Sequence, residues 1–291
     1  IGFSEEPSFS LLVVVRFLTG LFGHGVCFSL GVAAIGRTNN PDKNFAYSVA
    51  AQVIMGSLTA LLVPMAMSKY GISGMTIPAI FLALIGLFFV KYLFVNNPSE
   101  TNDGQTQDGS KIIFLPLIGL LIMVVWQMGV GPFFNNLVPY GIGNGISSDA
   151  IGIALFVSTA MSIIGPISAS MLIDKVDRSH AIFGALTVQI LIILSFTGEI
   201  TWIGFMLRAI CFQVAWNFVG PVLMGMIAAV DRSGNYSVMI PASQLGGISI
   251  GHAVIASLLN SGNPSLINYY SGSFIALSIL IYFILFKNRS E

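Results

Sequence analysis

The sequence predicts an all-α polytopic membrane protein, because charge is scarce and long apolar segments are frequent. Only 8% of the 291 residues are charged, whereas 55% are hydrophobic and the mean hydropathy is +0.87. Soluble globular chains carry about 25% charged residues. This chain therefore lacks the polar surface of a soluble enzyme, a nucleic-acid-binding protein or a disordered chain. No segment alternates polar and apolar residues with a period of two, which excludes a membrane β-barrel.

Nine segments are apolar over the roughly 20 residues that a helix needs to cross a bilayer. They cover residues 9–35, 45–68, 74–95, 112–138, 150–173, 179–197, 201–230, 236–260 and 267–286. The longest separation, 96–111, is polar and lacks apolar periodicity, which predicts a flexible cytoplasmic linker. We therefore expect a partial N-terminal bundle of three helices over 1–95, and a six-helix C-terminal bundle with a short tail over 112–291.

Basic residues predict the orientation of these helices. Loops on one side contain or adjoin Arg37, Lys43, Lys91, Lys111, Lys175, Arg178, Arg232, Lys287 and Arg289, whereas the opposite loops contain only Lys69. Basic residues favour cytoplasmic loops, so we expect the C-terminus in the cytoplasm and the protein in a bacterial inner or plasma membrane. The polar segment before the first span does not resemble a signal peptide. Because the first residue is Ile1, we expect a truncated or processed chain.

The chain resembles itself at an offset near 192 residues. Arg16 in the first span corresponds to Arg208 in the seventh, and Gln52 in the second corresponds to Gln244 in the eighth. Parallel repeats of this kind occur in transporters. The first three spans match the last three, so the middle three have no counterpart in this sequence. Two halves of six spans would give twelve, with the remaining three upstream of Ile1.

Two motifs resemble those of the major facilitator superfamily (MFS). The first is similar to the motif of that family's fourth helix and reads Leu12-x-x-x-Arg16-x-x-x-Gly20. The second is similar to its cytoplasmic loop G-x-x-x-D-R-x-G-R and reads Ser170-x-x-x-Asp174-Lys175-x-Asp177-Arg178. The resemblance covers essentially the whole chain, as helices four to twelve of twelve. Ser170 and Asp177 stand where the family favours glycine, and residues 56–64 lack the Gly-Pro-rich motif of drug–proton antiporters.

The resemblance implies a secondary active transmembrane transporter that moves a small organic solute by alternating access. It further implies a monomer in the lipid bilayer, with or without a coupling proton or ion, and without a cofactor, metal or nucleic acid. Loop residues Asp174, Lys175, Asp177 and Arg178 would form a cytoplasmic ion cluster that helps to hold one access state. The substrate and the direction of transport are not implied.

Polar side chains inside the spans are the candidates for substrate binding, because such groups are costly in lipid. Arg16 and Arg208 lie about 10 Å inside their spans at 1.5 Å per residue. They either face a cavity and hold an anion, or snorkel outward. His24 is a candidate proton relay or a neutral interhelical partner.

The resemblance also implies that the first, fourth and seventh spans line the cavity. This adds five candidate substrate contacts: Gln127, Asn135, Gln213, Trp216 and Asn217. Interhelical hydrogen bonds are the alternative role for each of them.

Small residues predict packing. Gly247-x-x-x-Gly251 would permit close approach of a neighbouring helix. Cys27 and Cys211 fall in apolar runs, and we expect both to behave as small core residues. Gly-Pro pairs predict kinks near Pro132, Pro166 and Pro221.

Two alternatives to a transporter are an intramembrane enzyme and a channel. Gly71-Ile72-Ser73-Gly74 superficially resembles a rhomboid serine motif, with His252 as a candidate base. Ser73 falls in a loop far along the chain from His252, and zinc-protease and Walker motifs are absent. A channel would need a ring of similar groups, whereas the internal repeat and the linker favour a carrier.

Overall fold

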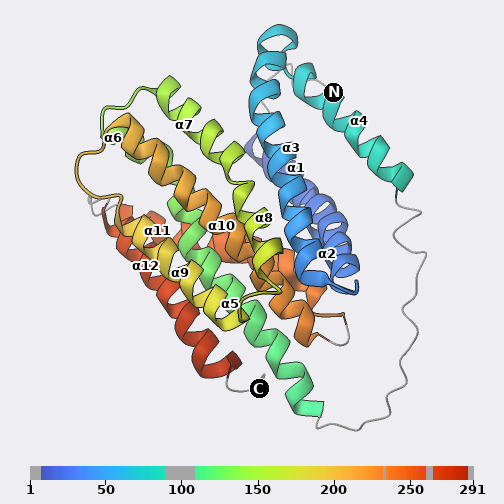
Figure 1. Ribbon diagram of the computed structural model, residues 1–291. Helices are drawn as coiled ribbons and strands as arrows, with labels where there is room; N and C mark the ends of the chain where they lie inside the picture. The colour runs from blue at the N-terminus through green and yellow to red at the C-terminus, as the bar shows by residue number, and fades with distance from the viewer. Residues whose placement is uncertain (1–7, 90–108, 232–233, 260–264, 288–291) are drawn as a thin grey trace.

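A computed structural model describes residues 8–89, 109–231, 234–259 and 265–287 (Figure 1). Helices are the only regular elements in these ranges, so the all-α fold is confirmed. Seven helical segments are long and apolar enough to cross a membrane, and α4 and α9 are shorter apolar helices.

The helices follow the nine predicted segments. In chain order they are α1 (Phe9–Thr19), η1 (Gly20–Phe28) and α2 (Ser29–Gly36); α3 (Pro41–Tyr70); α4 (Ser73–Phe89); α5 (Gly109–Asn135) and α6 (Leu137–Gly143); α7 (Ser148–Met161) and α8 (Ile164–Leu172); α9 (Arg178–Leu194); α10 (Trp202–Val230); η3 (Ser237–Met239) and α11 (Ile240–Leu259); and α12 (Ser265–Ile281) and η4 (Tyr282–Lys287). We call α1–α4 with η1 the N-terminal group, and α5–α12 with η3 and η4 the C-terminal group.

Capping residues explain several helix boundaries. Asn40 caps α3 by accepting a hydrogen bond from the Lys43 N–H at 3.4 Å, directly before Pro41 at the first helical position. Thr201 caps α10 in the same way, accepting from the Gly204 N–H at 3.2 Å. α3 ends at Gly71, whose φ of 58° lies in the left-handed region that favours glycine.

The predicted linker is too long at its C-terminal end. Residues 109–111 already belong to α5, while 96–108 lie outside the described residues. Gly109 and Ser110 are typical of a linker, and the apolar run that identifies the helix in the sequence begins only at Ile112.

The predicted kinks are partly found. The helix after Pro132 breaks at Asn136, between α5 and α6, and the break between α7 and α8 falls just before Pro166. α10 continues unbroken through Pro221. The first span carries a π-helical stretch, η1, that the sequence analysis did not predict; π segments often occur at functional sites.

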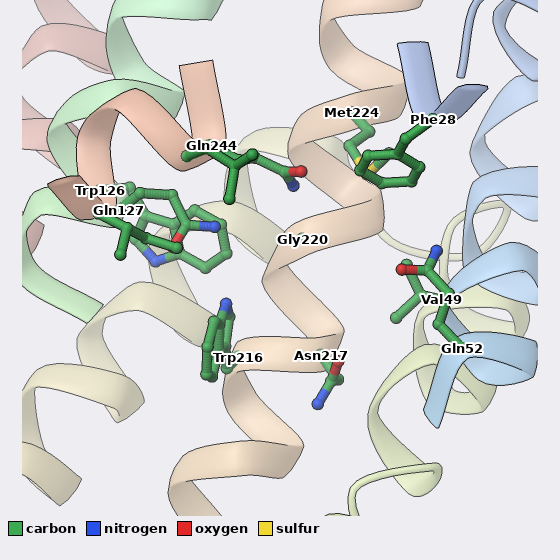
Figure 2. Close-up of a pocket in the computed structure, with 12 residues that line it drawn as sticks. Phe28, Val49, Gln52, Trp126, Gln127, Trp216, Asn217, Gly220, Met224 and Gln244 are labelled. Carbon is green, nitrogen blue, oxygen red and sulfur yellow. The ribbon is translucent and has the colours of Figure 1, made fainter. Parts of the chain in front are cut away.

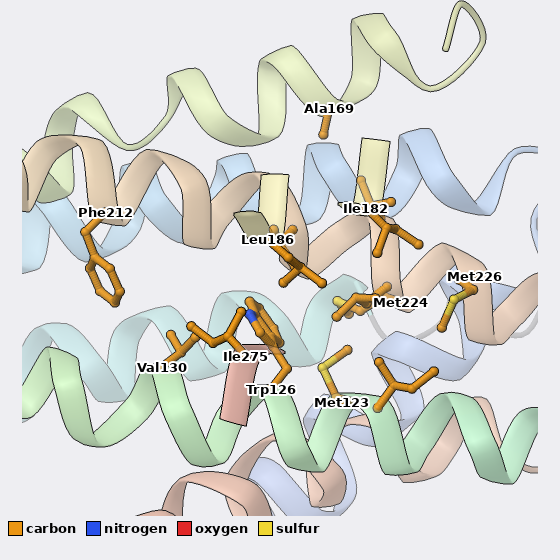
Figure 3. Close-up of a cluster of buried hydrophobic side chains, with 14 of the residues drawn as sticks. Met123, Trp126, Val130, Ala169, Ile182, Leu186, Phe212, Met224, Met226 and Ile275 are labelled. Atoms are coloured by element: carbon orange, nitrogen blue, oxygen red, sulfur yellow. The ribbon is translucent and has the colours of Figure 1, made fainter. Parts of the chain in front are cut away.

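The C-terminal group is tightly packed around α5 and α10. α5 packs against α11 and α12, and α10 packs against α7, α8, α9 and α5. Figure 3 shows buried side chains from several of these helices converging, among them Trp126, Leu186 and Ile275. Trp126 also donates a hydrogen bond from Nε1 to Oε1 of buried Gln189 at 2.9 Å, which fixes its indole ring.

Glycines allow α11 to approach α5 closely. A Cβ atom at Gly247 would collide with the carbonyl oxygen of Val124, and one at Gly251 would collide with that of Met128. The predicted packing role of this glycine pair is therefore confirmed. Cys27 and Cys211, by contrast, are exposed, so their prediction as core residues is wrong. An apolar helix in lipid has no need to bury every small residue.

Candidate functional site

A pocket of about 230 Å³ lies between the two groups (Figure 2). Its lining comes from η1, α3, α5, α10 and α11. The lining residues are Phe28, Val49, Gln52, Trp126, Gln127, Trp216, Asn217, Gly220, Met224, Gln244, Leu245 and Ile248. The pocket therefore lies where α3 and η1 of the N-terminal group meet α5, α10 and α11 of the C-terminal group, and a boundary between sets of helices is a common place for a ligand site.

The internal repeat converges on this pocket. Gln52 on α3 and Gln244 on α11, which correspond at the 192-residue offset, reach it from opposite groups. Phe28 and Gly220 correspond at the same offset and also line it. Figure 2 shows Gln52 on one side of α10 and Gln244 on the other. Two glutamines at equivalent positions of the repeat therefore line the pocket, one from each group.

Three predicted site residues line this pocket. Gln127 is only 3% exposed, and its Oε1 atom is buried without a hydrogen-bond donor. Trp216 packs against Phe134 at a ring-centroid distance of 5.2 Å and against Phe212 at 5.9 Å. Asn217 donates from Nδ2 to the Gln213 carbonyl at 3.0 Å, one turn earlier in α10. Gln127, Trp216 and Asn217 are therefore brought together as the sequence predicted.

Gln213 instead joins two helices. Its Nε2 donates to Ser158 Oγ at 2.6 Å, and its Oε1 accepts from Thr159 Oγ1 at 3.3 Å. Both ends of the amide are thus bonded to α7, and Gln213 does not line the pocket. For this residue the structure shows interhelical bonding, the alternative left open by the sequence.

Asn135 pairs with His252 about two turns along α5 from Gln127. Asn135 Nδ2 lies 2.6 Å from His252 Nε2, and His252 Nδ1 lies 2.7 Å from the Ile248 carbonyl oxygen. A neutral imidazole with its proton on Nδ1 satisfies both contacts. The pair links the end of α5 to α11.

The arginines do not share the pocket with the amides. Arg16 is exposed on α1, and Arg208 lines a separate groove of about 330 Å³ with apolar side chains of α9 and α10. Neither of them lines the central pocket. The side chain of His24 lies outside the described residues.

Two ion pairs join the groups at one end of the helices, which we call the charged end and define by Asp42, Lys43, Asp174 and Arg178. Arg178 donates from a guanidinium nitrogen to Asp42 Oδ2 at 2.7 Å, and the Lys43 ammonium contacts the Asp174 carboxylate. The carboxylate of Asp42 also lies directly against Gly225, where a Cβ atom would collide with it. The charged end is therefore closed by direct contacts between the groups.

The other two loop residues of the predicted cluster, Lys175 and Asp177, are not part of these two ion pairs. Asp177 caps α9, its Oδ1 accepting from the N–H groups of Ser179 at 2.9 Å and His180 at 3.2 Å. The backbone N–H of His180, together with that of Ser179, lowers the pKa of Asp177 from its ordinary value. Lys175 is exposed. Asp174 and Arg178 thus form ion pairs between the groups, whereas Asp177 acts within its own helix.

Four charged or amide residues of the pocket and the charged end were not among the predicted site residues: Asp42, Lys43, Gln52 and Gln244. The signal for the glutamines was already present, since the repeat placed them at equivalent positions. Asp42 and Lys43 look like ordinary loop charges in the sequence, and only the packing of α3 against α8 and α10 gives them partners.

The enzyme alternative gains no support from the geometry. The hydrogen bonds of His252 go to Asn135 and Ile248, and Ser73 begins α4, which packs against α3. The candidate nucleophile and base are thus not paired within the described residues.

The architecture has counterparts of known structure. One is the crystal structure of the MFS transporter FucP in the outward conformation, which superposes with a TM-score of 0.69 over 98% of this chain and 77% of that chain. The chain has the major facilitator fold. At 12% sequence identity the likeness establishes the fold and leaves the solute open. No protein-family model and no curated protein matches the sequence.

Proposed function

We propose that the chain is a secondary transporter that moves a small organic solute by alternating access, with the central pocket as its substrate site. The observation that carries the proposal is the pocket between the two groups, together with the ion pairs that join the groups at the charged end. Rocking of two helical bundles about a central site is the known mechanism of such folds. The major facilitator fold supports the same assignment.

The charged end is the gate in this proposal. Asp42–Arg178 and Lys43–Asp174 hold the groups together on the side where basic loops predict the cytoplasm, which corresponds to an outward-facing state. Opening toward the cytoplasm requires both pairs to separate. The two-bundle division and the cytoplasmic position of the C-terminus belong to this proposal as well.

Cysteine accessibility tests the proposal. In a chain with Cys27→Ser and Cys211→Ser, a single cysteine replacing Val49 at the pocket is reacted with a membrane-impermeant thiol reagent from each side of sealed vesicles. Alternating access predicts labelling from both sides, with the cytoplasmic rate raised when Asp42→Asn and Asp174→Asn open the charged end.

A cysteine at Met65, exposed on α3 and outside the pocket, serves as the control. Its labelling should not respond to the two gate substitutions. Labelling of the Val49 position from one side alone, unchanged by the gate variants, would contradict alternating access.

A further inference from the structure

We propose that the central pocket is built for an uncharged, polyhydroxylated solute of about monosaccharide size, held by amides of both groups. The inference rests on the proposed function and specifies its substrate class. Four of the lining side chains are amides: Gln52, Gln127, Asn217 and Gln244.

Amide side chains match hydroxyl groups in hydrogen-bonding capacity. Each amide offers two N–H donors and a carbonyl acceptor, and each hydroxyl both donates and accepts. None of the described lining residues carries a charge. A charged solute entering there would lose its hydration without gaining a counter-charge from these residues, which disfavours its binding.

Gln127 supplies the most specific anchor. Its Oε1 is buried and has no donor among the described residues, although most buried acceptors in folded proteins have one. Because Gln127 lines the pocket, a rotation of its amide would bring this atom to a hydroxyl donor of a bound solute. The unpaired oxygen therefore points to a ligand that donates hydrogen bonds.

Trp216 supplies an apolar wall. Its contacts with Phe134 and Phe212 hold the indole in place from the side of the C-terminal group. An aromatic face of this kind packs against the C–H face of a ring whose hydroxyls point toward surrounding amides. A pocket that combines amides with one fixed aromatic face fits a ring polyol better than a fully apolar solute.

The volume limits the size of the solute. The pocket measures about 230 Å³, below the roughly 300–1,000 Å³ of sites that take drug-sized ligands. Gln52 and Gln244 stand on opposite groups, so a solute that bonds to both would contact the two moving parts at once. Binding and movement are coupled when the ligand has different affinities for the two arrangements.

Matched sets of probes that differ mainly in charge test the proposal. The full chain in detergent is titrated with glucose, glucuronate and glucosamine, and with galactose, galacturonate and galactosamine, while tryptophan fluorescence and the thermal unfolding midpoint are measured. We expect at least one neutral sugar to bind about tenfold or more tightly than its charged counterparts. Trp216→Phe should reduce the fluorescence response and leave the part that comes from Trp126, which also lines the pocket.

Amide variants locate the binding. The affinity for the neutral sugar should fall by about three- to tenfold in each of three variants: Gln127→Ala, Gln52→Ala and Gln244→Ala. Asn44→Ala, an amide of α3 that does not line the pocket, should leave the affinity unchanged. Gln244→Glu places a carboxylate in the pocket and should shift preference toward the aminated probe, a gain that misfolding does not produce.

The outcomes separate this inference from the proposed function. Tighter binding of a charged probe that is lost in Gln127→Ala overturns the substrate class and leaves the transporter assignment standing. Equal response to all probes, or no response to any, also overturns the substrate class. The transporter assignment falls only if the Val49 cysteine fails to show alternating access.

Discussion

The N-terminal and C-terminal groups are related by one sequence repeat but differ sharply in burial. In the most apolar 18-residue window, 0% of Phe9–Gly36 and 6% of Pro41–Tyr70 are buried, against 67% of Phe114–Gly143 and 61% of Trp202–Val230. Hydropathy is nevertheless similar, from 1.6 to 2.0 across the four. Apolar composition thus identifies contact with lipid or protein without distinguishing between them.

Some glycines follow this contrast and others do not. Gly247 and Gly251 lie directly against the α5 backbone, whereas Gly23 and Gly56 in the N-terminal group have open space where a side chain would go. Gly74 on α4, however, lies directly against the α3 backbone, and Gly184 and Gly246 in the C-terminal group meet open space. Two glutamines follow the contrast. Gln213 is bonded at both ends to α7, whereas exposed Gln52 donates from Nε2 to Ser48 Oγ on its own helix at 3.3 Å.

Glycine replacement should give the largest contrast between the groups. Gly251→Leu forces a side chain into the Met128 carbonyl and should destabilise the fold by about 1–3 kcal/mol or more. Gly56→Leu meets open space and should change stability by less than about 0.5 kcal/mol. Thermal unfolding of both variants in detergent measures the difference. Equal destabilisation would mean that the two groups are packed alike.

Replacing the two buried glutamines with methionine should change the stability of the protein in opposite directions. Gln213→Met removes two hydrogen bonds to α7 and leaves Ser158 and Thr159 without that partner, at a cost of about 1–3 kcal/mol. Gln127→Met removes an unpaired buried oxygen and should leave stability unchanged or raise it by about 1 kcal/mol while weakening solute binding. Unfolding midpoints and sugar titrations are compared. A marked loss of stability in Gln127→Met would show that Gln127 has a structural partner.

The ion pairs between the groups should have a smaller effect. Arg178 and Asp42 are partly exposed at 33% and 16%, so solvent screens their attraction and the pair contributes about 1 kcal/mol. Asp42→Asn should shift the balance between access states by about fivefold toward opening of the charged end. Thiol labelling of the Val49 cysteine reads this shift. An unaltered rate in Asp42→Asn would remove the gate role.

Asp177 should have the smallest effect, a change in the pH dependence of the unfolding midpoint. Because backbone N–H bonds lower its pKa, its capping contribution is complete above the ordinary aspartate pKa of about 3.9 and is lost as the pH falls through the lower folded-state pKa. His180 Nδ1 also lies 3.1 Å from Asp177 Oδ1, so the comparison is made in a His180→Gln background. Below about pH 4 the unfolding midpoint should fall more steeply with Asp177 present than in Asp177→Asn, which keeps a capping oxygen. Identical acid-side profiles of the two chains would contradict this assignment.

The helices were predictable from sequence because lipid imposes a strong length and polarity requirement on each span. The nine apolar segments located the helices, and Gly247 with Gly251 marked a close packing site. The π-helical stretch over Gly20–Phe28 was not predictable, since three glycines permit it without requiring it. The start of α5 was placed late because Gly109 and Ser110 resemble linker residues.

The site was predicted less completely. Gln127, Trp216 and Asn217 follow from their positions on spans expected to line a cavity. Gln213 has the same residue type as Gln127, and only the position of Ser158 and Thr159 on the neighbouring helix assigns it to packing. Arg208 illustrates the same limit: the sequence places it inside a span, but the groove that it lines depends on how α10 packs against α9.

The central claim is that the two groups move about the pocket as opposed units. Pulsed electron paramagnetic resonance on two doubly spin-labelled chains tests it most directly. One pair joins Tyr47 on α3 to Met171 on α8 near the charged end, and the other joins Met65 on α3 to Ile153 on α7 toward the opposite end; all four side chains are exposed. The account predicts two populations in each chain, and Asp42→Asn with Asp174→Asn should lengthen the first distance and shorten the second. A single unchanged distance in both pairs would contradict it.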